Sequence, residues 1–167
     1  VCKFLIDRGA KLYEEDEYRS FYAFSVLTSA AGMGHVGVCN LLIDRGAKID
    51  LVVDSSRNTA LMIASENGHI DICKLLIDCG AKIDLVDKEL SALTSAAEGG
   101  HINIFELLLD CGADILKYGN EALYIAAFRG HINMCKLLID LGVEIDLLRS
   151  GYGLTPLMRA ILMDHID

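Results

Sequence analysis

The chain has 167 residues, 53% of them hydrophobic, and a formal net charge of −9 at pH 7. This charge argues against a nucleic-acid partner, because binding to a phosphate backbone depends on clustered lysine and arginine. No run of about 18 uninterrupted apolar residues is present, so we expect no direct insertion into a membrane.

In chain order, the sequence opens inside a repeating unit. Residues Val1–Lys11 (VCKFLIDRGAK) match Val38–Lys48 (VCNLLIDRGAK), which predicts a second helix whose first helix is missing. The chain stops just after His165, where another second helix should begin. We therefore expect a monomeric fragment of a longer array. Its predicted divisions are a partial repeat at 1–12, repeats at 13–50, 51–84, 85–116 and 117–146, and a partial repeat at 147–167.

The repeats share one spacing. A leucine stands eight residues before the histidine of each Gly-His pair, and a glycine stands eleven residues after that histidine; these histidines are His35, His69, His101 and His131. The stretch from that glycine to the next leucine varies from 11 to 15 residues. Helices of fixed length joined by variable loops indicate a stacked helical solenoid. The predicted helix pairs lie near Ser25–Gly46, Thr59–Gly80, Ala92–Gly112 and Ala122–Gly142.

The repeat at 51–84 shows how each unit is built. Leu61 and Ala64 fall on one face of a short helix, and alanine recurs at the Ala64 position in every copy. A small residue there lets the next repeat approach closely. Gly68 breaks the helix, a second helix that is apolar around most of its circumference follows, and Gly80 is expected to end it in a left-handed conformation.

The six cysteines are interpreted as reduced thiols of the core. Phe105 fills in one repeat the position that cysteine holds in four others, as expected of an apolar packing site. No CxxC spacing typical of zinc sites occurs. Reduced thiols fit an intracellular, cytoplasmic protein. The cysteines at the shared position are Cys2, Cys39, Cys73 and Cys135, and a second position holds Cys79 and Cys111.

The histidine of each Gly-His pair admits a structural and a metal-binding interpretation. Successive copies should lie about 8–10 Å apart, as packed helices do, whereas zinc needs nitrogens about 2.1 Å from one ion. We therefore expect these histidines to hydrogen-bond the backbone near the turn, and we predict no metal and no cofactor.

These residues resemble the ankyrin repeat family. The resemblance rests on Leu41–Ala47 (LLIDRGA), on the Gly-His pairs and on Thr155-Pro156-Leu157, and it covers nearly the whole chain. It implies an all-α solenoid of helix-turn-helix repeats that binds a protein partner on its concave face. Because proline is missing from the other copies and two loops are short, irregular turns are expected in place of regular β-hairpins.

The same resemblance points to partner-binding residues on the concave face and loops. Phe128 is the most specific candidate, because it stands where two other copies have glutamate, and an aromatic side chain there could anchor a partner. The alternative is that Phe128 folds against a short loop and is buried. The complete set of candidates is Met33, Glu66, Asn67, Glu98, Phe128, Arg129, Ser56, Arg57, Lys88, Glu89, Tyr118 and Tyr152, the two tyrosines being expected on adjacent loops.

No catalytic motif is recognisable: the sequence has no glycine-rich phosphate loop, nucleophile elbow or His-Glu-x-x-His helix. We therefore predict a non-enzymatic protein-interaction scaffold. Two alternatives stay open: a non-catalytic targeting or packing arm of a larger enzyme or channel, and a spacer without a specific partner.

Overall fold

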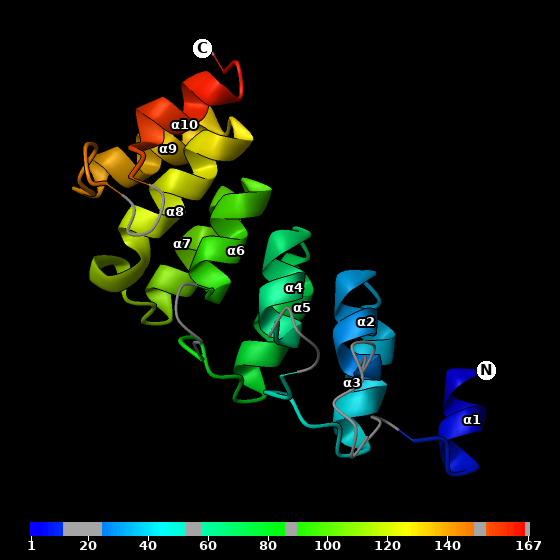
Figure 1. Cartoon of the computed structure of the whole chain (residues 1–167). Coiled ribbons are helices and arrows are strands. Elements are labelled where there is room, and N and C mark those ends of the chain that lie inside the picture. Colours follow the sequence, from blue (N-terminus) through cyan, green and yellow to red (C-terminus); the bar gives the residue numbers. More distant parts are fainter. Residues whose placement is uncertain (12–24, 53–57, 86–89, 149–152, 166–167) are drawn as a thin grey trace.

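The computed structural model describes residues 1–11, 25–52, 58–85, 90–148 and 153–165, and in these residues the chain is a stack of helix pairs (Figure 1). The predicted all-α solenoid is confirmed: the only strand-like positions in the described ranges are isolated bridge residues at Asn58 and Leu90. The first helices of the pairs are α2 (Val26–Gly32), α4 (Ala60–Glu66), α6 (Ala92–Gly99), α8 (Ile115–Arg129) and α10 (Pro156–Leu162). The second helices are α1 (Cys2–Asp7), α3 (Val36–Asp44), α5 (Ile70–Asp78), α7 (Ile102–Asp110) and α9 (Ile132–Asp140).

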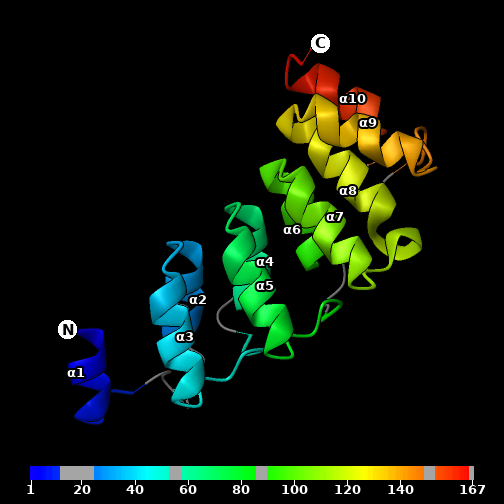
Figure 2. The same cartoon turned by 180° about the vertical axis from the view of Figure 1, so that it is seen from behind.

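The first helices form one layer and the second helices another. The second helices α3, α5 and α7 come to the front when the molecule is seen from behind (Figure 2). Neighbouring first helices contact each other more extensively than neighbouring second helices do. The stack therefore bends toward the first-helix row, and we call the surface of that row the inner face.

Hydroxyl and carboxylate side chains start the first helices. Ser25, Thr59, Ser91, Asp114 and Thr155 each stand at a helix N-cap and accept a hydrogen bond from a backbone N–H of the first turn. These bonds satisfy donors that have no partner inside the helix. The N-caps therefore compensate for the proline that the sequence lacks at most helix starts.

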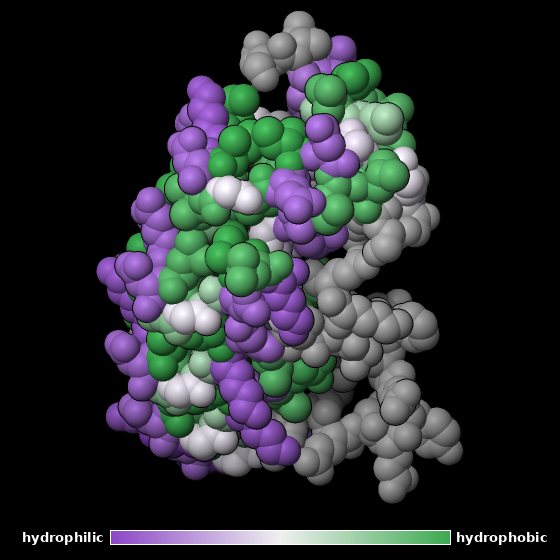
Figure 3. All heavy atoms as spheres, turned by 90° about the vertical axis from the view of Figure 1, so that its left-hand side faces the viewer, coloured by the Kyte–Doolittle hydropathy of each residue, from purple (hydrophilic) through white to green (hydrophobic). Residues whose placement is uncertain are grey.

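Each first helix presents the repeated alanine to its neighbours. Ala64, Ala96 and Ala126 have no exposed surface, and Ala30 is also buried. The second helices add further large side chains to the core, including the fully buried Phe105 and Leu108 of α7. In the space-filling view, hydrophilic residues form a column along one edge, with hydrophobic residues beside them (Figure 3).

The Gly-His pairs connect each repeat to the one before it. The Nε2 atom of His101 lies 3.1 Å from the carbonyl oxygen of Glu66, at the end of the preceding first helix, and that of His131 lies 2.8 Å from the carbonyl of Glu98. His69 and His165 make the same contact with Gly32 and Phe128. The ring nitrogen donates to a carbonyl that the helix end leaves without an internal partner.

The glycine of each pair makes room for the next histidine. Gly100 has a φ of +72°, which suits glycine, and a Cβ atom there would come within 2.7 Å of Nδ1 of His131. The structural interpretation is therefore confirmed for three histidines of the Gly-His pairs (His69, His101 and His131), with the partner being the backbone of the preceding repeat; His165, which follows Asp164, makes the same contact. His35 has no such contact in the described residues.

The fourth repeat differs from the predicted plan. Its first helix, α8, begins at Ile115 and not near Ala122, because Asp114 caps a helix that runs on through the expected loop; its carboxylate accepts from the N–H of Lys117 at 3.1 Å. The placement of Tyr118 on a loop was wrong. Tyr118 lies inside α8 and is only 2% exposed.

The cysteines divide into two groups. Cys39 and Cys73 are fully buried, as expected of apolar packing positions. Cys79 and Cys111 are exposed, which corrects the expectation of a core position, because each is the C-cap residue of a second helix and follows its last buried turn. Cys2 is also exposed, on α1 at one end of the stack.

Candidate functional site

The predicted partner-binding residues of the first helices cluster at the helix ends on the inner face. Met33 and Asn67 are C-cap residues of α2 and α4, and both are exposed. Glu66, Glu98 and Arg129 are the final or near-final residues of α4, α6 and α8. The sequence therefore predicted their common location, which follows from one repeat position recurring in successive helices.

An ion pair joins two of these side chains across neighbouring repeats. The guanidinium of Arg129 on α8 donates to the carboxylate of Glu98 on α6. Asn67 instead turns back on its own helix, where its Nδ2 donates to the carbonyl of Ile63 at 2.9 Å. Glu98 is thus held in place on the inner face by Arg129, while the side-chain amide of Asn67 already donates a hydrogen bond within its own helix.

Glu66 lies close enough to Glu98 and Arg129 for both charges to act on it. Partial burial raises the pKa of the Glu66 carboxyl above its ordinary value, the negative charge of Glu98 raises it further, and the positive charge of Arg129 opposes both. The three groups carry two negative charges and one positive charge at neutral pH. This part of the inner face is therefore acidic.

Phe128 is half-buried, so neither the fully exposed nor the fully buried alternative describes it. The guanidinium carbon of Arg159 on α10 lies 4.1 Å from the centre of its ring, and that of Arg129 lies 5.4 Å away. Arginine over an aromatic ring is an attractive arrangement. Phe128 is therefore covered in part by charged side chains of α8 and α10.

A hollow of about 370 Å³ lies beside Phe128. We call it the inner-face hollow; its lining residues are Leu90, Glu98, Glu121, Tyr124, Ile125, Phe128 and Arg159. These residues come from α6, α8, α10 and the segment before α6. The volume falls at the lower end of the range for ligand pockets, which suits one side chain of a partner.

Five lining residues of the hollow had not been predicted: Leu90, Glu121, Tyr124, Ile125 and Arg159. Tyr124 could have been found from the sequence, because it is the one aromatic residue at a position occupied in the other repeats by Thr28, Met62, Thr94 and Met158. Glu121 was not indicated by the repeat pattern, because its position in the hollow depends on the unexpected extension of α8.

The remaining predicted residues do not join this site. Ser56, Arg57, Lys88, Glu89 and Tyr152 lie outside the described residues. Tyr118 lies in the N-terminal extension of α8 and is buried, so it cannot extend an exposed aromatic patch as predicted.

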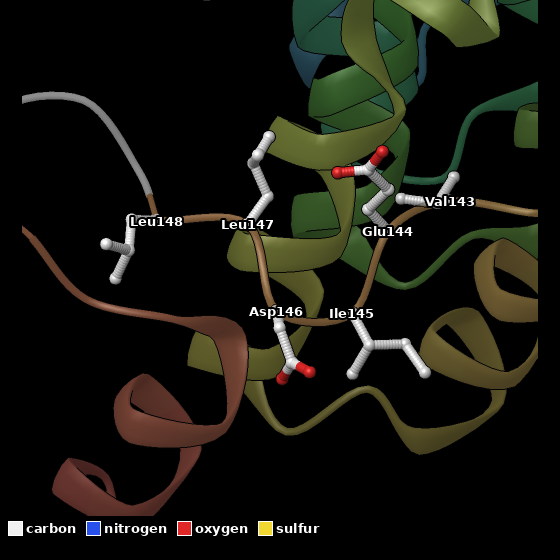
Figure 4. A pocket seen from close by; sticks show the side chains of 6 residues that line it. All are labelled: Val143, Glu144, Ile145, Asp146, Leu147 and Leu148. Atoms are coloured by element: carbon white, nitrogen blue, oxygen red, sulfur yellow. The ribbon is translucent and has the colours of Figure 1, made fainter.

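A second, wider hollow of about 720 Å³ follows α9 and is lined by the loop residues 143–148 (Figure 4). Glu144 and Leu147 point to one side of the loop, whereas Ile145 and Asp146 point to the other. Because one extended segment forms the lining and its side chains diverge, this hollow does not gather functional groups. It is a weaker candidate than the inner-face hollow.

Two other kinds of site were sought in the described residues. Nowhere in the described ranges do three or more His, Cys, Asp or Glu side chains come together in a way that could hold a metal ion. Among the described helices, none combines the length and hydrophobicity needed to cross a bilayer.

Comparison with known proteins identifies the architecture. A family model of ankyrin repeats in three copies matches residues 1–87, 51–118 and 93–167, which together span the chain. No curated protein matches the sequence.

Proposed function

Because the chain belongs to the ankyrin repeat family, we propose that it is a protein-binding scaffold that holds its partner on the inner face. Ankyrin repeats are generally non-catalytic interaction modules. The observation that carries the proposal is the inner-face hollow, which places a half-buried phenylalanine beside charged side chains.

The composition of this surface suits a protein partner. A few aromatic and arginine side chains supply most of the affinity in typical interfaces, and charged residues around them fix orientation. Phe128, Tyr124 and Arg159 line the hollow together, and the ion pair of Glu98 and Arg129 lies at its edge. We therefore place Phe128 at the centre of the binding surface, with Met33, Glu66, Asn67, Glu98 and Arg129 around it.

The test is the substitution Phe128→Ala, with Phe4→Ala as the matched control. Phe4 is 58% exposed and lies on α1, in the second-helix row, so its removal leaves the inner face intact. Proteins captured from an extract by the wild type and by both variants are quantified by mass spectrometry. Affinities for a captured protein are then measured with purified components.

We expect Phe128→Ala to weaken binding of the specific partner by about 1–3 kcal/mol, and Phe4→Ala to leave it unchanged. Because Phe128 is half-buried, the variant should lose less than about 2 kcal/mol of unfolding free energy in urea titrations. Equal capture by the wild type and Phe128→Ala would contradict the proposal. A loss of binding that merely follows a larger loss of stability would contradict it as well.

A further inference from the structure

The inner-face hollow keeps free space although one arginine of the chain already lies in its wall. Arg159 places its guanidinium carbon 4.1 Å from the ring centre of Phe128 and 5.7 Å from that of Tyr124. The volume of about 370 Å³ remains beside these three side chains. The two rings are thus already seen in contact with a guanidinium, and there is room for a further side chain.

The charges around the hollow favour a cation. Glu98 and Glu121 line it, and Glu66 lies near Glu98. Among the described residues, the positive charges near the hollow include Arg159, which stacks on Phe128, and Arg129, which pairs with Glu98. Three described carboxylates therefore lie near these two guanidinium groups. Glu98 keeps acceptor capacity beyond its bond to Arg129, because a carboxylate can accept about four hydrogen bonds.

The raised pKa of the Glu66 carboxyl also indicates that the charges around the hollow favour a cation. Its pKa is raised by burial and by the charge of Glu98, in spite of the nearby Arg129. A further positive charge placed beside these carboxylates would reduce their mutual repulsion. A carboxylate ligand would instead have to approach Glu98 and Glu121, and would add to the repulsion.

The apolar part of the lining sets the shape of the occupant. Tyr124, Ile125 and Phe128 offer aromatic and aliphatic surface in the same lining as the carboxylates of Glu98 and Glu121. An arginine side chain combines an apolar stem with a planar cation that stacks on aromatic rings and bonds carboxylates through several N–H groups. Its dimensions and its chemistry both fit this lining.

We propose that the inner-face hollow accepts an arginine side chain of the protein partner. The stem of the arginine lies against Tyr124, Ile125 and Phe128, and its guanidinium faces the carboxylates of Glu98 and Glu121. This inference rests on the proposed function, because it names the chemistry of the partner at that same surface.

The experiment titrates the isotope-labelled protein with N-acetyl-arginine amide and follows binding by NMR. N-acetyl-citrulline amide, which has nearly the same shape without the charge, is the matched ligand control, and N-acetyl-glutamate amide tests the opposite charge. We expect saturable shifts of the Tyr124 and Phe128 resonances with the arginine compound. Citrulline should bind about tenfold more weakly, because a bond between charged groups is replaced by a neutral one.

Protein variants locate the site. Glu98→Gln and Glu121→Gln keep the size of each side chain and should each weaken arginine binding several-fold. Glu106→Gln makes the same change at an exposed position of α7 and should have no effect. The amide spectrum of each variant reports whether its fold is preserved.

Two results would overturn the inference: citrulline or glutamate binding as tightly as arginine, or arginine shifts that persist in both glutamine variants. The proposed function can be contradicted independently of this inference. If arginine amide does not bind but Phe128→Ala still abolishes capture of a partner, the scaffold function stands and the arginine site is wrong. If arginine amide binds as described but partner capture ignores Phe128, the site exists and the scaffold function on this face is wrong.

Discussion

The two rows of helices solve the same packing problem with different side chains. In the first-helix row, neighbouring helices approach closely and bury alanine at one repeated position, as Ala64 and Ala96 show. In the second-helix row, contacts between neighbours are sparser and the buried side chains are large, as with Phe105. Alanine at the repeated position therefore determines how closely the first helices approach, whereas large buried side chains, which both rows contain (Leu61 in the first, Phe105 in the second), supply most of the hydrophobic stabilisation.

This comparison predicts that the largest loss of stability comes from removing a large buried side chain of the second-helix row. Phe105 has no exposed surface, so Phe105→Ala should lower the unfolding free energy by about 3–5 kcal/mol, through lost hydrophobic transfer and a residual cavity. Urea denaturation followed by circular dichroism measures the change. Phe4→Ala, at an exposed position, should stay within about 0.5 kcal/mol of the wild type. Similar losses for the two variants would show that the row is not the main source of stability.

The first-helix row should be damaged in the opposite way, by added volume. Ala96 is fully buried between α4 and α8, so Ala96→Leu should force the helices apart and cost about 1–3 kcal/mol or more. Ala160 holds the same repeat position in α10 but is only partly buried, and Ala160→Leu should cost much less. Urea denaturation gives the loss of unfolding free energy in each variant, and the ratio of the two losses tests the prediction. Equal losses would mean that the alanine does not control the approach of the repeats.

The sequence predicted the two rows well because their causes are local and repeated. The constant interval from Leu61 to Gly80 recurs in each unit, and the glycine φ values of +72° to +89° at Gly68, Gly80 and Gly100 agree with the predicted turns and caps. Such signals need no knowledge of neighbouring repeats. The helix pairs could therefore be located from spacing alone, except for the start of α8.

The candidate site was less predictable because it depends on contacts between repeats. The extension of α8 could have been inferred from Asp114 as an N-cap followed by apolar residues at Ile115, Tyr118 and Ala122, which fall on one helical face. The stacking of Arg159 on Phe128 had no such signal, because it joins side chains of different repeats. The sequence indicated Phe128 as a candidate but did not indicate which side chains surround it.

A smaller effect is expected at the turns that link the repeats. His101→Ala removes the hydrogen bond from Nε2 to the carbonyl of Glu66, with a distance of 3.1 Å, and should cost about 0.5–1.5 kcal/mol. His35 makes no corresponding contact in the described residues, and His35→Ala should therefore have little effect. The two variants are compared by thermal and urea denaturation. A His35→Ala loss equal to that of His101→Ala would show that the contact with the preceding repeat is not what stabilises the turn.

The smallest effect on stability should come from reagents that act on thiols or metals. All six cysteines are free thiols, and no group in the described residues is placed to hold a metal, so a reductant or a chelator should leave the melting temperature unchanged. A clear drop with either reagent would contradict this interpretation.

The same thiols can report on the second-helix row without a mutation, because a disulfide reagent reacts with the thiolate of an accessible cysteine. Burial raises the pKa of Cys73 to about 11, against a weaker opposing effect of its hydrogen bond to Ser65, and burial also raises the pKa of Cys39. Near pH 8 the thiol of Cys73 should therefore be almost entirely protonated, and both thiols are inaccessible because they are buried. The exposed Cys79 and Cys111 should react first, and Cys39 and Cys73 only as fast as the repeats open. Mass spectrometry of the labelled protein over time gives the order in which the cysteines react.

The same measurement can be made on Phe105→Ala. Because this substitution weakens the row that holds Cys73, it should accelerate the labelling of Cys73 and leave the labelling rate of Cys79 unchanged. An unchanged labelling rate of Cys73 would show that the second-helix row does not stabilise its neighbours as one unit.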